Sequence, residues 1–429
     1  MFDFVPSTVL DSFLMAWRYI YLFMPAWLPV LFITLGFQAW VNYKRAYYWN
    51  VKLGSVVLEL KLPKDIYKSP LAMELVLNQM HQTADEGNWY WKYQKGQTRS
   101  WFSLEIASFG GDIHFYVWLR KKYRVGMEAH LYSQYPGIEI NEIEDYTIPF
   151  SFDPNRQKMT AVQWKLDEPD PLPISTYVDY KLDKDPKEEF KVDPLTSQLE
   201  FLGSLPKGHN CWIQIIVQAH HKRDHPRFLS PSKWFEKGFS EKYDPWKEEA
   251  LEMIKKIREE ATTKYVDEKG VEHSGFPNPT KGQTEKIAAL ERSINKLGFD
   301  VGLRSMYFAD KDIYDNIYVG GMLGSFKQYS TLGYNGFGIN GWHMAYSNPW
   351  KDKLWKGNPE RLGAMVMEEY KLRRFFYSPY RGRFFYAKSF VLNTEELATI
   401  YHLPGEIAAT PTLGRVPSKK SEAPPNLPV

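Results

Sequence analysis

The chain has a single cysteine, Cys211, among its 429 residues. It therefore has no internal disulfide and no cysteine-rich zinc or iron–sulfur site, which fits a reducing compartment. The dipeptide Gly-Lys does not occur, and this excludes the usual phosphate-binding loop of P-loop ATPases. The motifs H-E-x-x-H and G-x-S-x-G are also missing, and no paired carboxylates stand out. We therefore expect no catalytic residue, no bound metal and no cofactor, and a protein that is not an enzyme.

Neither sign of charge predominates: the chain has 54 basic and 51 acidic side chains, and its net charge is +3. The overall balance thus carries no information about partners, and only local clusters can. With 44% hydrophobic and 16% aromatic residues, the chain is expected to be folded. Its length allows two or three domains.

Two short motifs are weak. Gly336, Gly338 and Gly341 match G-x-G-x-x-G, but a dinucleotide site needs an apolar strand before the glycines and a helix after them. A glycine-rich loop or a bulged strand is favoured instead.

The run "AHHKRDHPR" holds His220, His221 and His225 with Asp224. Its lysine and arginines would repel a cation, and regular structure does not fix all of these positions. A solvated strand end is favoured over a basic loop that contacts anions or a partner, and over a metal site.

One long apolar run stands near the amino terminus. Residues Tyr19 to Val41 carry no charge, and at about 1.5 Å per residue such a run can cross a hydrocarbon core of about 30 Å. We predict an amino-terminal segment, 1–50, with one transmembrane helix at about 19–41. Pro25 and Pro29 predict a kinked or broken first turn.

The flanking charges predict orientation. Arg18 precedes the run, whereas Lys44, Arg45 and Lys52 follow it. The positive-inside rule then places the amino terminus outside the cell inner (cytoplasmic) membrane and the domains that follow in the cytoplasm. The rival interpretation is a signal peptide, but a basic leader and a small-x-small cleavage site are missing.

The fold class predicted for the rest is α+β, with two ferredoxin-like units. Residues 51–150 read as strand, helix, strand, strand, helix, strand, with a hairpin turn at Gly110-Gly111. Residues 151–390 read as a distorted copy, in which "VDPLTSQLEFLGSL" repeats the capped helix start of "KSPLAMELVLNQM". Its central strands are separated by an insertion, about 226–297, whose two apolar seams predict an antiparallel helical hairpin.

A basic and aromatic segment lies at 371–388, with no acid between Glu369 and Glu395. Cations beside rings are typical of grooves that bind single-stranded nucleic acid. The same pattern fits a hairpin with core aromatics and solvated arginines, or a membrane surface. The candidate contacts to nucleic acid or a partner are Lys371, Arg373, Arg374, Phe375, Tyr380, Arg381, Arg383 and Lys388.

The last segment, 391–429, is expected to be a short docked helix and an extended proline-rich tail. Asn393 or Thr394 can cap the helix, and Leu397, Ile400 and Tyr401 give it an apolar face.

Several stretches together resemble a known family: "LPKDIYKSPLAMELVLNQMH", "WYWKYQKGQTRSWFSLEIASFGGDIHFYV", "EAHLYSQYPGIEINEIEDYT", "FVLNTEELATIYHLPG" and "KKSEAPPNLP". They resemble the membrane-anchored amino-terminal region of an uncharacterised family related to type IV secretion and conjugative DNA-transfer coupling ATPases of reduced-genome bacteria. In that family the last helix and tail lead into a motor domain, whereas this sequence ends at Val429.

The resemblance implies a non-catalytic platform that docks a separate motor ATPase, with the lipid bilayer, the ATPase and sibling copies as partners. It also implies linker contacts for Glu395, Glu396, Leu397, Tyr401 and His402. The alternative function is a membrane-anchored module that binds single-stranded nucleic acid, such as DNA, through 371–388.

Overall fold

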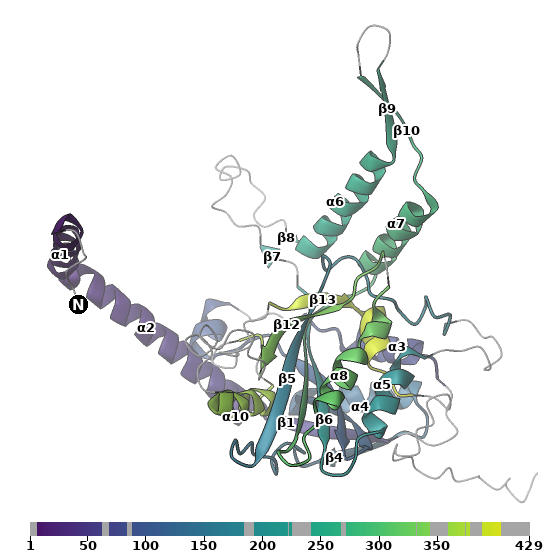
Figure 1. Ribbon diagram of the computed structural model, residues 1–429, viewed down its shortest axis with the longest axis horizontal. Helices are drawn as coiled ribbons and strands as arrows, with labels where there is room; N and C mark the ends of the chain where they lie inside the picture. The colour runs from purple at the N-terminus through teal and green to yellow at the C-terminus, as the bar shows by residue number, and fades with distance from the viewer. Residues whose placement is uncertain are drawn as a thin grey trace, which may run out of the picture. The chain divides into compact units, whose positions relative to one another are not determined.

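The computed structural model describes most of the chain (Figure 1). The chain separates into two compact units. The helical unit comprises Met1–Gly54 and Asp85–Thr98, and the sheet unit comprises Ser55–Ala84 and Arg99–Val429. The described residues are 7–61, 68–83, 88–183, 193–221, 223–224, 242–266, 272–331, 333–343, 359–373, 375–377 and 388–404.

The helical unit contains two long helices, α1 (Ser7–Leu22) and α2 (Met24–Tyr47). A π-helical turn, η1 (Tyr48–Leu53), continues α2, and a second one, η2 (Tyr90–Gln94), belongs to the same unit. From Met24 to Leu53 the helix is long and apolar enough to cross a membrane. The predicted span of 19–41 begins too early, because the helix breaks at Phe23. Pro25 lies within the first two positions of α2, where its missing N–H costs no hydrogen bond.

The sheet unit is built on one antiparallel sheet of nine strands, in the order β12-β5-β11-β6-β2-β3-β1-β4, with β13 paired to β11. The strands are β1 (Ser55–Lys61), β2 (Phe102–Phe109), β3 (Asp112–Arg120), β4 (Glu139–Ile143), β5 (Gln157–Leu166), β6 (Asn210–Ala219), β11 (Gly298–Asp310), β12 (Phe337–His343) and β13 (Phe390–Asn393). The predictions of mixed helix and sheet and of an apolar amino-terminal helix are thus confirmed.

The same connectivity occurs twice in this sheet. In each half, the first strand lies between the third and the fourth, and the second lies beside the third. The first half is β1-α3-β2-β3-α4-β4, with α3 (Leu71–Met80) and α4 (Arg124–Gln134). The second half is β5-α5-β6-β11-α8-β12, with α5 (Pro194–Gly203) and α8 (Asn316–Gly324). Pairing of β2 with β6, from Phe102 opposite Val217 to Phe109 opposite Asn210, joins the halves into one sheet.

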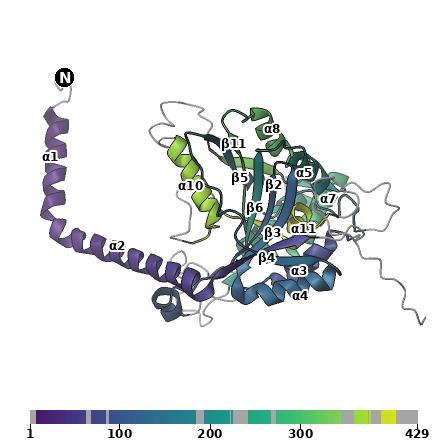
Figure 2. The same cartoon turned by 90° about the horizontal axis from the view of Figure 1, so that it is seen from below.

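The two faces of the sheet are covered differently. Leu104 and Ile106 of β2 belong to the main core, together with buried residues of α3, α4, α5, α8 and α11 (Thr394–Ile400). Helix α10 (Pro359–Lys371) lies on the other side of the sheet in Figure 2. There Glu105, which alternates with Leu104 and Ile106, accepts hydrogen bonds from Gln214 of β6 and from Arg373, just after α10. The sheet therefore has one apolar face and one face with buried charge.

The β2–β3 hairpin turns at Gly110 and Gly111, which have φ of +62° and +93°. A Cβ at Gly111 would lie 2.8 Å from the carbonyl oxygen of Leu205. Both the backbone angle and the close approach require glycine there, so the predicted hairpin is confirmed.

Between β6 and β11 two helices extend away from the sheet (Figure 1). Helix α6 (Pro245–Glu260) begins after the cap Asp244, and α7 (Lys281–Ile294) begins with a capping box at Thr280. The ribbon of β9 (Thr262–Val266) and β10 (Glu272–Pro277) joins them. Their seam buries Ile254, Ile257 and Leu290 against Leu172. This is the region in which the sequence predicts a helical hairpin.

Candidate functional site

The candidate residues from the sequence fall in two carboxyl-terminal segments of the sheet unit. In the first, Arg373 and Phe375 are buried, Lys371 is half-buried and Lys388 is exposed. Arg374, Tyr380, Arg381 and Arg383 lie outside the described residues. In the second, the residues Glu395, Glu396, Leu397, Tyr401 and His402 are all buried. The predicted contact residues are thus largely interior wherever the structure describes them.

Arg373 lies just after α10 and binds two carboxylates. Its Nε and Nη2 donate to the two oxygens of Glu105, each at 3.0 Å, and Nη1 donates to Asp145. Both Arg373 and Glu105 have fully buried side chains. Burial alone would lower the pKa of Arg373, but the charges of Glu105 and Asp145 outweigh burial and raise it. A bidentate pair of this kind fixes the end of α10 on the sheet.

A second arginine extends this cluster across the sheet. Arg304 of β11 donates to Gln214 of β6 at 2.7 Å and to the carbonyl oxygen of Glu369 at 3.0 Å. Gln214 in turn donates to Glu105 at 2.8 Å. Burial lowers the pKa of Arg304 to about 10, so the side chain stays charged at neutral pH. The cluster therefore links the central strands β2, β6 and β11 to α10.

The position of Arg373 is at odds with a contact to nucleic acid. Its guanidinium already binds two carboxylates in the interior. Phe375 packs so close to β11 that a Cβ at Gly302 would lie 2.5 Å from its ring. A nucleic-acid groove needs cations and rings that are open to solvent. A role in nucleic-acid binding stays a prediction for the rest of the segment.

The second segment begins with β13, which pairs with β11 over Phe390–Asn393. Asn393 then caps α11: its side chain accepts from the Glu396 N–H at 2.9 Å, and the Glu396 carboxylate accepts from the Asn393 N–H at 2.8 Å. The other Glu396 oxygen accepts from the Ile174 N–H at 3.0 Å. Burial raises the pKa of Glu396 to about 8. This reciprocal capping box is the local signal that places the helix.

Glu395 ties α11 to the hairpin and to the first half of the sheet. Lys296, just after α7, lies 2.8 Å from Glu395 and 2.7 Å from Glu74 of α3. Arg292 of α7 lies 3.5 Å from Glu395. Burial would lower the pKa of Lys296, but the two carboxylates outweigh it and raise the pKa. Three elements far apart in sequence thus share one ion-pair cluster.

At the end of α11, His402 binds the second half of the sheet unit. Its Nε2 lies 3.0 Å from Asp193, which caps α5. Burial would lower the pKa of His402, but Asp193 outweighs it and raises the pKa. Tyr401 donates to the carbonyl oxygen of Tyr116 at 3.1 Å. Helix α11 is therefore held by both halves.

In the histidine run, His220 contacts two aspartates. His220 lies between Asp300 at 2.8 Å and Asp244 at 3.2 Å. Burial alone would lower the pKa of His220, but these hydrogen bonds raise it to about 9. His225 lies outside the described residues. Within the described ranges, no three His, Cys, Asp or Glu side chains are placed to hold a metal ion.

The glycine motif also has a structural explanation. Phe337–His343 forms β12, and its register with β5 shifts between Ile339 and Gly341. A Cβ at Gly338 would lie 1.9 Å from a carboxylate oxygen of Asp167. Of the two predicted alternatives, a glycine-rich loop or a bulged strand, the structure shows a strand with a shift in register.

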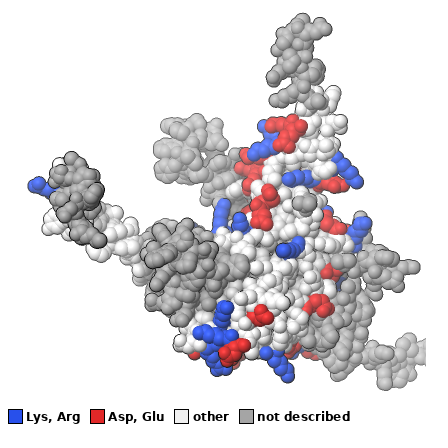
Figure 3. Space-filling view, viewed as in Figure 1, with Lys and Arg blue, Asp and Glu red and all other residues white. Residues whose placement is uncertain are grey.

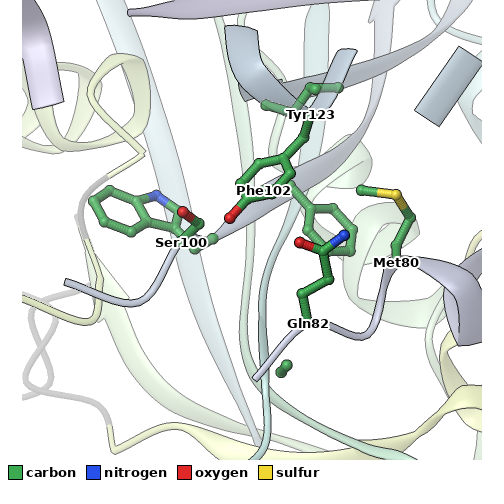
Figure 4. A pocket seen from close by; sticks show the side chains of 8 residues that line it. Met80, Gln82, Ser100, Phe102 and Tyr123 are labelled. Atoms are coloured by element: carbon green, nitrogen blue, oxygen red, sulfur yellow. The ribbon is translucent and has the colours of Figure 1, made fainter. Parts of the chain in front are cut away.

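A small pocket opens between α3, β2 and β3 (Figure 4). Met80, Gln82, Phe102 and Tyr123 line it, and it offers about 20 Å³ to a water-sized molecule. That volume holds about one water, so the pocket does not fit a metabolite.

Charges of both signs interleave on the visible face of α6 and α7 (Figure 3). Arg258 and Glu291 pair across the two helices at 3.2 Å. This face therefore carries no single-sign field of the kind that attracts a polyanion.

Comparison with known proteins adds no family. A scan against protein-family models gives no match, and a search of curated proteins gives no relative.

Proposed function

We propose that the chain is a non-catalytic, membrane-anchored platform that docks the motor ATPase of a type IV secretion-like or conjugative DNA-transfer apparatus. The observation that carries the proposal is the docking of α11. This helix is completely buried, and its Glu395 pairs with Lys296 after α7, which also pairs with Glu74 of α3. His402, just after the helix, pairs with Asp193 at the start of α5. Residues after Pro404 that contact the separate motor would start from a firmly held point.

The helical unit supports the membrane part of the proposal. Most of α2 is exposed, including Leu31, Phe32, Ile33 and Leu35. Such a long apolar surface is unstable in water and is matched by lipid. With Lys44, Arg45 and Lys52 after the span, the sheet unit would lie in the cytoplasm of a bacterial inner membrane.

The sheet unit supports the platform part. We interpret its halves as two ferredoxin-like units, because each half has the β-α-β-β-α-β order with the first strand between the third and the fourth. The pairing of β2 with β6 joins them into one continuous sheet, which supports a platform. Assembly of several copies around a motor stays a prediction.

The test is affinity purification of the full chain from membranes of its native host. The control is a chain that ends at Pro404, which keeps all described elements. We expect a Walker-type ATPase to be enriched with the full chain and lost with the shortened one. Recovery of no ATPase with the full chain in any detergent would count against the platform.

A further inference from the structure

Residues 88–98 lie against the carboxyl-terminal end of α2, although they follow it by about forty positions in sequence. Trp49 of η1 donates its Nε1–H to the hydroxyl of Thr98 at 2.8 Å, and both side chains are buried. The rings of Phe37 and Tyr93 lie 5.4 Å apart. These contacts hold the segment beside the helix.

Gly96 makes this contact possible. It has φ of +73°, and a Cβ there would lie 2.4 Å from the carbonyl carbon of Lys44. The two backbones therefore touch, and a side chain at residue 96 would push them apart. Such a close approach indicates a built contact between the segment and α2.

The docked segment exposes aromatic rings. Trp89, Tyr90 and Trp91 are 64%, 47% and 43% exposed. On the adjoining part of the helix, Tyr43 and Tyr47 are 64% and 49% exposed. So many large rings in water are unfavourable, and they mark a surface that binds something.

The same region is rich in cations. Lys44 lies 4.5 Å from the ring of Trp40, and Lys95 lies 5.3 Å from the ring of Tyr90. Lys92 adds a further cation. Residues 40–52 and 88–98 contain no Asp or Glu. The surface therefore suits a partner with negative charge beside an apolar layer.

We infer that residues 88–98 form an interfacial anchor, which inserts its rings at the headgroup layer of an anionic bilayer beside the end of α2. This inference rests on the proposed membrane role of α2. Twenty residues from Met24 reach Tyr43, and at about 1.5 Å each they cross about 30 Å of hydrocarbon. The segment contacts the helix from Phe37 to Trp49, and this stretch includes the level at which that layer ends. Amphipathic Trp and Tyr rings favour this depth, and lysines favour lipid phosphates.

Lipid is the occupant that continuity favours. Leu35, Phe37 and Trp40 of α2 are exposed, and the contact of Phe37 with Tyr93 joins this apolar surface to residues 88–98. The lipid that surrounds Ile33 would therefore also reach the rings of residues 88–98.

The test places spin labels on the full chain in vesicles of phosphatidylcholine and phosphatidylglycerol. Cys211 is completely buried, so cysteines introduced at exposed positions can be labelled selectively. The label positions are Ile33→Cys within the span, Gln94→Cys in the segment, and Phe276→Cys on β10, where the native ring is 94% exposed. Collisions with oxygen and with an aqueous nickel chelate then report depth.

We expect the label at residue 94 to read between the other two, with nickel collisions reduced severalfold relative to residue 276. Trp89→Ser combined with Trp91→Ser should restore nickel collisions at residue 94, whereas Phe276→Ser should not. If the label at residue 94 collides with nickel as often as the label at residue 276, while the label at residue 33 lies deep in the bilayer, the interfacial anchor is wrong but the membrane span stands. A water-exposed reading at residue 33 overturns both the anchor and the span.

Discussion

Replacing Arg373 with methionine gives the sharpest test of the buried cluster. Methionine keeps much of the length of the side chain but removes the charge and all N–H donors. Glu105 would keep its hydrogen bonds from Tyr146 at 2.7 Å and Gln214 at 2.8 Å. It would lose its bidentate cation, and Asp145 would lose the same partner. A buried carboxylate that has lost its directly bound cation is the main consequence.

The magnitude follows from the burial of both partners. Breaking a buried ion pair by removing one side costs about 3–5 kcal/mol. That is a large part of the roughly 5–15 kcal/mol by which folded domains are stable. At about 2 °C per kcal/mol in a large domain, Tm should fall by about 6–10 °C. Adding Glu105→Gln to Arg373→Met removes the stranded charge and should recover about 1–3 kcal/mol.

The assay is thermal and urea unfolding of the full chain in detergent, followed by circular dichroism. Arg156→Ala is the matched control, because Arg156 is 74% exposed and pairs with Asp310 at 3.2 Å. A surface pair of this kind is worth about 0–1 kcal/mol. If Arg373→Met destabilises the chain no more than Arg156→Ala does, the cluster does not hold α10 on the sheet.

Three further predictions concern other contacts. Because the pKa of His220 is raised, its ion pairs stabilise the fold in full below about pH 6.5, and this stabilisation is lost as pH rises through about 9. Urea unfolding from pH 6 to 9.5 should therefore show a free energy of unfolding that changes less with pH for His220→Gln than for the unchanged chain. Gly96→Ala should separate residues 88–98 from α2, because its Cβ would meet the helix backbone; trypsin should then cleave there faster, with Gly36→Ala unchanged. Leu290→Ala should cost about 2–5 kcal/mol within the hairpin; hydrogen exchange should rise in α6 and α7, but not after Leu251→Ala, which alters a residue that is 57% exposed.

The sequence predicts local structure correctly where that structure depends on residues within a single turn or helix end. The Gly110-Gly111 turn, the capped start of α5 and the cap at Asn393 are all visible in the sequence and present in the structure. Strand β5 was missed, although Val162, Trp164 and Leu166 alternate with polar residues. The signal was short, and β5 gains its place only by pairing with β11 and β12.

The site depended on contacts that no local pattern carries. In sequence, Arg373 is one cation in a basic and aromatic run, and such a run predicts an exposed surface. In the structure it meets Glu105 and Asp145, which lie more than 220 positions earlier. The burial of Glu395 likewise depends on Lys296, which lies about 100 positions earlier.

By itself the sequence determined the apolar helix, the alternation of the strands, the glycine turns and the helix caps, because these depend on neighbours within a few residues. Only the tertiary structure decided which charges are solvated and which are locked inside. A charged side chain can be buried only where a partner of opposite sign is brought to it, and for Arg373 and Glu395 those partners come from distant elements.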